Sequence, residues 1–108
     1  MDNIYQDYID ARQSDVKERY RYYSMVRLAT ETQVSKIEGI EKRKLGAYVV
    51  DHIVPISIGF LAGIPISKMA SLENLQLITH SDNNKKKDKI IPEGESLLIK
   101  WGILQQTK

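Results

Sequence analysis

The spacing of hydrophobic residues divides the chain into segments with helical and with strand-like patterns. Residues 15–36 carry apolar side chains at steps of three or four, which predicts a helix that starts after a cap at Ser14 or Asp15. A shorter amphipathic helix is predicted within residues 1–13, at Ile4, Tyr5, Tyr8 and Ile9. We expect residues 1–38 to form a helical extension with a packing face made by Val16, Tyr20, Tyr23, Val26 and Thr30.

Two short apolar runs in the second half of the chain predict the strands of an antiparallel hairpin. The first run covers residues 47–54, and Pro55 should end it, because proline has no amide hydrogen for a strand ladder. The second run covers residues 74–78. Residues 56–72 between them are apolar but contain two glycines and a proline, so we expect a packed connection with a helical turn around residues 67–70.

Helical patterns return after the second strand. A polar and basic helix is predicted from a cap at Thr79 or Ser81 to about Lys89, and residues 90–94 should break it. A helix over residues 95–105 then closes the core with Leu97, Leu98, Trp101 and Leu104. The whole pattern predicts one α+β domain over residues 1–108, in which a two-stranded antiparallel hairpin and a helix are flanked by N-terminal and C-terminal helices.

Composition narrows the chemistry that such a domain can perform. The chain has 108 residues and no cysteine, which excludes disulfides and any structural zinc site made of four cysteines. Its net charge of +2 says little by itself, but lysines cluster in residues 85–89. No apolar run is long enough for a membrane span, and the N-terminus lacks the basic start and apolar core of a signal peptide, so we expect a cytoplasmic protein without membrane contact.

Three polar motifs lie at the ends of the predicted strands and in the helix that follows them. They are Asp51-His52-Ile53-Val54-Pro55, Glu73-Asn74-Leu75-Gln76-Leu77 and Asn83-x-x-Lys86. In a regular strand Asp51 and His52 point to opposite faces, so both reach one site only if the strand bends or ends there. In this order the three motifs resemble the signature of the HNH endonucleases, and the resemblance covers a core motif of residues 47–89.

The resemblance implies a ββα-metal fold and a role for each polar residue. His52 corresponds to the general base, while Asn74 supports the loop that holds His52. Asp51 and Asn83 correspond to the ligands of one divalent cation, with Mg²⁺ or Mn²⁺ as the expected ions and Zn²⁺ or Ni²⁺ as alternatives. Asn84 also precedes a lysine by three residues, and His80 lies nearby, so each is an alternative ligand to Asn83.

Basic residues beside the proposed site are candidates for contacts with DNA phosphates. The predicted set is Lys85, Lys86, Lys87, Lys89 and His80. A lysine face that is simply solvated is the alternative, as it is for Lys17, Arg19, Arg21 and Arg27 in the N-terminal helix.

These expectations combine into a metal-dependent DNA endonuclease of low sequence specificity that nicks DNA or cuts both strands. It resembles the small stand-alone HNH proteins of phages and mobile elements. The alternative is a catalytically inactive HNH-fold module that binds DNA or helps to assemble a phage or mobile-element machine. Either protein could be a monomer or a homodimer, and the apolar connection over residues 56–66 could contact a protein partner.

Overall fold

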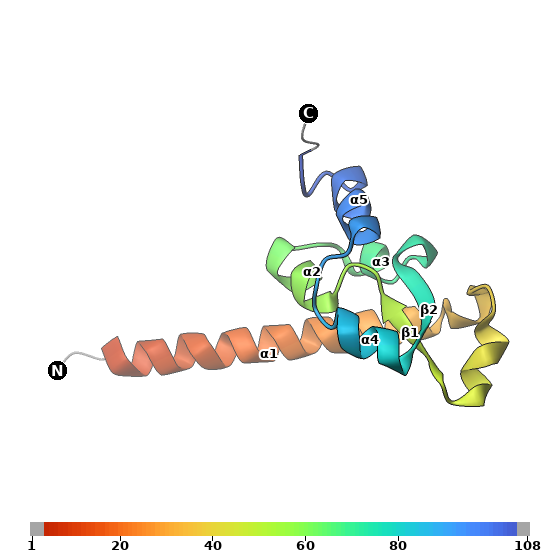
Figure 1. Cartoon of the computed structure of the whole chain (residues 1–108). Coiled ribbons are helices and arrows are strands. Elements are labelled where there is room, and N and C mark those ends of the chain that lie inside the picture. Colours follow the sequence, from red (N-terminus) through yellow and green to blue (C-terminus); the bar gives the residue numbers. More distant parts are fainter. Residues whose placement is uncertain (1–3, 106–108) are drawn as a thin grey trace.

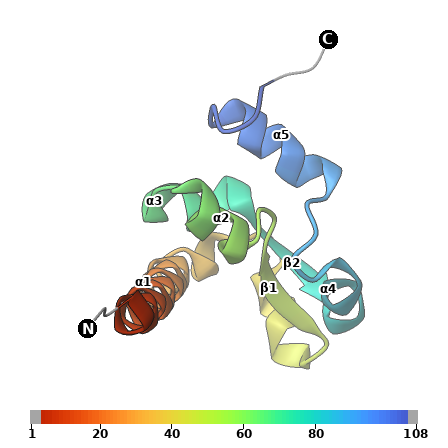
Figure 2. The same cartoon turned by 90° about the vertical axis from the view of Figure 1, so that its left-hand side faces the viewer.

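A computed structural model describes residues 4–105, with side chains from residue 15 onward. The protein is an α+β fold with a two-stranded antiparallel sheet and several helices (Figure 1). In Figure 2, seen nearly along the first helix, the hairpin lies between α4 on one side and α1 with α2 on the other. The helices and strands are α1 (Ile4–Glu31), β1 (Tyr48–His52), α2 (Ile56–Ala62), α3 (Ile66–Met69), β2 (Leu75–Thr79), α4 (His80–Lys86) and α5 (Pro92–Lys100).

Helix α1 is one continuous helix, so the predicted division near Ser14 and Asp15 is wrong. No glycine or proline occurs between Ile4 and Glu31, and nothing in the backbone therefore interrupts the helix. Its 28 residues span about 42 Å at 1.5 Å per residue, and its N-terminal half extends away from the rest of the fold (Figure 1). The radius of gyration is accordingly 16.7 Å, above the ~13 Å expected for a compact domain of this length.

Within residues 15–31, the part of α1 whose side chains are described, the later turns pack against the fold. Val26 and Thr30 of the predicted packing face are buried, and Tyr23 is half-buried. Val16 and Tyr20 are 61% and 75% exposed, because α2 and α3 contact the later turns of the helix and leave the earlier ones uncovered. The positions Ile4, Tyr5, Tyr8 and Ile9 lie outside the residues whose side chains are described. Within residues 4–105, neither α1 nor any other helix combines the length and apolarity of a membrane span.

Two short 3-10 helices, Val34–Lys36 and Ile40–Leu45, lead from α1 to the hairpin. In the hairpin, Tyr48 pairs with Thr79, and His52 pairs with Leu75 at the other end. Strand β1 ends at His52, two residues earlier than predicted, and β2 is shifted by one residue because Asn74 closes a 3-10 turn.

The connection between the strands is packed, as predicted, but it contains two short helices. The predicted turn corresponds to α3, whereas α2 was not expected. Pro55 and Pro65 each precede one of these helices, and Gly63 ends α2 in the left-handed region with a φ of 68°. At Gly59, a Cβ atom would lie 2.7 Å from both Met69 Sδ and the Tyr22 hydroxyl, so α2 packs against its neighbours without room for a side chain.

The two C-terminal helices differ from their predicted bounds. Helix α4 begins after a cap at Thr79, whose hydroxyl accepts a hydrogen bond from the amide of Asp82, but it ends at Lys86 rather than near Lys89. Helix α5 begins at Pro92, inside the predicted break, because proline is well suited to the first turn of a helix. It ends at Lys100, so Leu104 follows the helix and is 41% exposed.

The core draws on helices from both ends of the chain. Its fully buried residues come from α1, from the loop after β1, from the segment between α2 and α3, from α3 and from α5, and they are Val26, Val54, Ile64, Met69 and Leu98. Tyr22, Leu97 and Trp101 pack around them. The Tyr22 hydroxyl also donates a hydrogen bond to the carbonyl of Ile64, at 2.6 Å, which ties α1 to the turn between α2 and α3.

Candidate functional site

An open cleft of about 280 Å³ lies where the end of β1 meets α4 and α1. Asp51 and His52 enter it from β1, Asn83 enters from α4, and Arg27 enters from α1. Because β1 ends at His52, Asp51 and His52 both line the same cleft although they are adjacent in the sequence. The fold therefore brings together the expected base and both expected metal ligands. It adds the positively charged side chain of Arg27, which lies outside the three motifs.

Asp51 is a buried carboxylate held from two sides. Gln76, its partner across the hairpin, donates a hydrogen bond from Nε2 to Oδ2 at 2.9 Å. The ammonium group of Lys86 lies 3.4 Å from each carboxylate oxygen. These contacts fix the carboxylate at the edge of the cleft and balance its charge.

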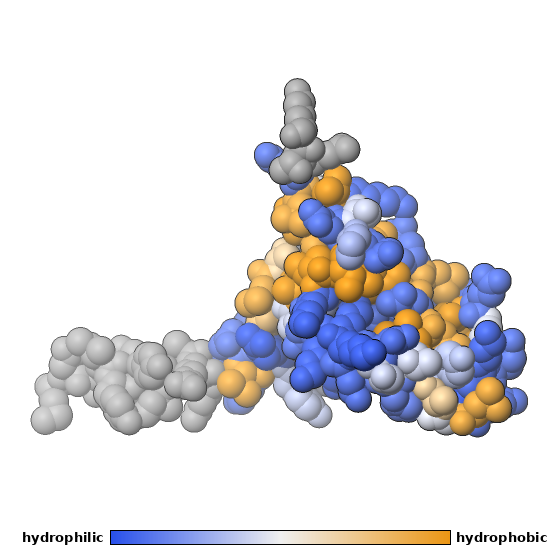
Figure 3. All heavy atoms as spheres, viewed as in Figure 1, coloured by the Kyte–Doolittle hydropathy of each residue, from blue (hydrophilic) through white to orange (hydrophobic). Residues whose placement is uncertain are grey.

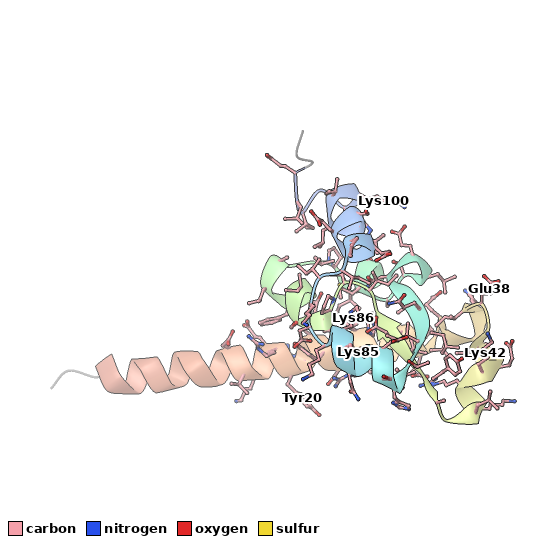
Figure 4. All side chains as sticks on the ribbon, in the orientation of Figure 1. Tyr20, Glu38, Lys42, Lys85, Lys86 and Lys100 are labelled. Carbon is pink, nitrogen blue, oxygen red and sulfur yellow. The ribbon has the colours of Figure 1, made fainter. Side chains whose placement is uncertain are left out.

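Lys86 is the one residue of the predicted DNA-contact set that the fold turns inward. Its side chain is 6% exposed, and Nζ also donates a hydrogen bond to the carbonyl oxygen of His52 at 3.0 Å. Lys86 is therefore an internal partner of Asp51, and its prediction as a DNA contact is wrong. Figure 4 labels it on α4 beside Lys85, which is exposed.

The imidazole of His52 is half-buried against α1. Its Nε2 lies 2.8 Å from the hydroxyl oxygen of Thr30. Burial lowers the pKa of His52 below its ordinary value of 6.5; nearby Asp51 opposes this shift, while Lys86 and Arg27 add to it. A histidine with a lowered pKa is neutral at physiological pH, which is the form that can accept a proton.

Asn74 is fully buried and lies away from the cleft, where it anchors the loop that follows β1. Its Oδ1 accepts a hydrogen bond from the amide of Val54 at 2.7 Å, and its Nδ2 donates to the carbonyl of Met69 at 2.9 Å. Its backbone carbonyl accepts from the amide of Ile53 at 2.7 Å. The side chain and main chain of Asn74 thus hold the two residues after His52, which is the supporting position that its motif implies.

Asn83 and Asn84 both line the cleft, but Asn83 is half-buried while Asn84 is exposed. His80 lies at the opposite end of the hairpin, where its Nε2 is 3.0 Å from the carbonyl oxygen of Gly46, and it does not line the cleft. From residue 15 to residue 105, no three His, Cys, Asp or Glu side chains group closely enough to hold a metal ion. The carboxylate and amide oxygens that line the cleft are those of Asp51, Asn83, Asn84 and Asp88.

The remaining lysines of the cluster are exposed. Lys85 lies on α4, whereas Lys87 and Lys89 follow it. Lys87 also lines the cleft and has a φ of 47°, a left-handed value that is uncommon for a residue with a side chain. Figure 3 shows hydrophilic residues gathered over α4, so this helix presents a polar surface next to the cleft.

Sequence reasoning missed the contacts that Thr30 and Gln76 make with the Asp-His pair. Thr30 was predicted only as a packing residue of a helix, and no feature of the sequence links it to His52. For Gln76 a signal existed, because an antiparallel register that pairs Leu75 with His52 places Gln76 opposite Asp51.

Arg27 also lines the cleft, a position that its place in a basic helix did not predict. Its guanidinium group lies 5.6 Å from the ring centroid of Tyr23, which also lines the cleft.

No family model, curated protein or solved structure matches the chain.

Proposed function

We propose that the protein is a metal-dependent endonuclease that hydrolyses phosphodiester bonds in DNA through an HNH-type ββα-metal site. The observation that carries the proposal is the meeting of Asp51, His52 and Asn83 in one open cleft, although Asn83 lies 31 positions after His52 in the sequence. A carboxylate, a neutral imidazole and an amide oxygen form a set that suits metal-assisted hydrolysis.

His52 is the proposed general base. Its neutral imidazole takes a proton from a water molecule as the water oxygen attacks phosphorus, and the bond from phosphorus to the leaving oxygen of the sugar breaks. Arg27 supplies a positive charge at the same cleft, where a phosphate group would lie. Asn74 keeps the loop behind His52 in place and does not itself contact the reacting atoms.

Asp51 and Asn83 are the proposed ligands of the metal ion. Hard cations such as Mg²⁺ and Mn²⁺ accept one or two protein oxygens and keep water and phosphate oxygens as their other ligands, which fits a pair of ligands made by Asp51 and Asn83. Without cysteine and without a group of three acidic or imidazole side chains in the described region, the donor set is less suited to Zn²⁺ or Ni²⁺. A bound cation would stabilise negative charge on the phosphate and on the departing oxygen.

One observation favours the alternative, an inactive module that binds DNA or a phage or mobile-element partner. The ammonium of Lys86 already lies against both oxygens of Asp51 and competes with a cation for that carboxylate. The two functions differ in one measurable respect, because only the nuclease converts DNA in a metal-dependent way.

A supercoiled plasmid tests the proposal, since it reports nicked and linear products separately. We expect the supercoiled plasmid to be converted to nicked or linear DNA with Mg²⁺ or Mn²⁺, and to stay supercoiled with a chelator. The variant His52→Ala should cleave about 10²- to 10⁴-fold more slowly, which is the usual contribution of a general base. His80→Ala is the matched control, because His80 lies at the far end of the hairpin and outside the cleft. Metal-independent conversion, or a rate for His52→Ala within about threefold of the wild type, would refute the assignment.

A further inference from the structure

The hydrogen bond between Thr30 of α1 and His52 bears on which nitrogen of the imidazole ring carries hydrogen. Thr30 is 5% exposed, and its Oγ1 lies 2.7 Å from the carbonyl oxygen of Val26 and 2.8 Å from Nε2 of His52. Both distances are typical of hydrogen bonds. Thr30 lies 22 residues before His52, outside the residues that resemble the HNH signature.

A hydroxyl group has one hydrogen to donate and two lone pairs that accept. The carbonyl oxygen of Val26 can only accept, and two oxygens 2.7 Å apart repel one another unless a hydrogen lies between them. The hydrogen of Thr30 therefore points to Val26. The oxygen of Thr30 is then left as an acceptor, and the hydrogen of the second bond must come from Nε2 of His52.

We propose that Thr30 is a positioning residue that holds neutral His52 in the tautomer with hydrogen on Nε2, and so leaves the lone pair on Nδ1 to accept the proton. This proposal rests on the proposed nuclease function only for its consequence in catalysis. The imidazole lies between two hollows: Thr30 lines one of them, while Asp51 and Asn83 line the other. With Nε2 bound to Thr30, Nδ1 is the nitrogen available to the cleft.

Nitrogen NMR of the ¹⁵N-histidine-labelled full chain, without metal or DNA, tests the hydrogen bond directly. At a pH of about 8, above the ordinary histidine pKa of about 6.5, the protonated and unprotonated ring nitrogens give well-separated signals. The chain has two histidines, so a His80→Gln variant assigns the pair. We expect His52 to carry hydrogen on Nε2 only, with slow exchange, in the wild type and in Thr30→Ser.

Thr30→Val keeps the shape of the side chain and removes the acceptor. We expect this variant to show a mixture of tautomers with a rapidly exchanging ring hydrogen, and to cleave about 10- to 100-fold more slowly, by analogy with the cost of losing the partner that orients a metal-binding histidine. Binding of DNA should be unchanged. Thr32→Val is the matched control, because the Thr32 hydroxyl also bonds to a carbonyl at the end of α1, that of Ala29, without touching His52.

The outcomes separate this proposal from the nuclease function. Hydrogen on Nδ1 in the wild type, or an unchanged spectrum in Thr30→Val, would overturn the role of Thr30 even if the protein cleaves DNA. The expected spectra in a protein that never cleaves DNA would support the hydrogen-bond assignment and refute the nuclease. A loss of cleavage in Thr30→Val that Thr30→Ser restores would support both.

Discussion

Replacing Lys86 by Met would leave the buried carboxylate of Asp51 without its cation. Methionine is close to lysine in length and shape, so the change removes the charge and the hydrogen bond to the carbonyl of His52 while largely preserving packing. Both side chains of the ion pair are less than a tenth exposed, so water cannot readily replace the lost partner. We therefore expect a large loss of stability from a residue that looks like a surface lysine in the sequence.

The geometry gives the size of the effect. Two unit charges 3.4 Å apart attract by about 5 kcal/mol at an effective dielectric constant of about 20. Removing one partner of a buried ion pair typically costs about 3–5 kcal/mol, a large part of the roughly 5–15 kcal/mol that stabilises a domain. With a urea dependence of about 1.5–2 kcal/mol per molar for a chain of this size, the unfolding midpoint should fall by about 2 M.

Urea unfolding in the presence of a chelator, followed by circular dichroism, measures the difference. Lys85→Met is the matched control, because Lys85 is the exposed neighbour and its loss should change the stability by no more than about 0.5 kcal/mol. The double variant Lys86→Met with Asp51→Asn removes both charges and should recover at least half of the loss. Equal midpoints for the Lys85 and Lys86 variants would refute the buried pair and return Lys86 to the candidates for DNA contact.

Three further predictions concern the metal, the DNA and the pH. Asn83→Ala should weaken metal binding in a calorimetric titration, with partial recovery of cleavage at high metal, whereas Asn84→Ala should do neither; the reverse result would make Asn84 the ligand. Replacing Lys85 and Lys87 together by Gln should flatten the slope of log K against log salt by about one to two units in fluorescence anisotropy with His52→Ala as background. An unchanged slope would mean that these lysines are only solvated. Because the pKa of His52 is lowered in the fold, the unfolded chain binds more protons below about pH 6.5, so metal-free stability should fall as the pH drops from about 7 through 6.5 toward the folded pKa. Urea unfolding at several pH values should show a smaller fall for His52→Gln, and an identical fall would contradict the lowered pKa.

The hairpin and the cleft could be predicted from the sequence because their residues obey local rules. Alternation and Pro55 indicated the end of β1 to within two residues, and the resemblance to the HNH signature implied that Asn83 approaches Asp51 and His52. That the side chain of Lys86 points into the protein could not be predicted in the same way. In a run of three lysines, only the packing of α4 on the sheet decides which one faces inward.

The helices show a similar limit. Two glycines and Pro65 correctly argued against one long helix in the connection. However, Gly63 and Pro65 also mark the end of one short helix and the start of another, while Gly59 lies inside α2, and α2 was missed for that reason. In α1, Ser14 resembles a cap in the sequence, yet without glycine or proline nearby the helix passes through it. Tertiary contacts decided which of its turns are buried.

The contacts that hold the Asp-His pair also set the order in which the chain can assemble. Thr30 reaches His52 across 22 residues, Asn74 reaches Val54 across 20, and Lys86 reaches Asp51 across 35. Because closing such loops takes entropy before any contact forms, we expect the cleft to form late in folding. During synthesis, a chain that has not yet reached Asn83 lacks this residue and also Lys86, the neutralising partner of Asp51. The hydrolytic activity that we propose would therefore arise only after α4 has been made and has packed on the hairpin.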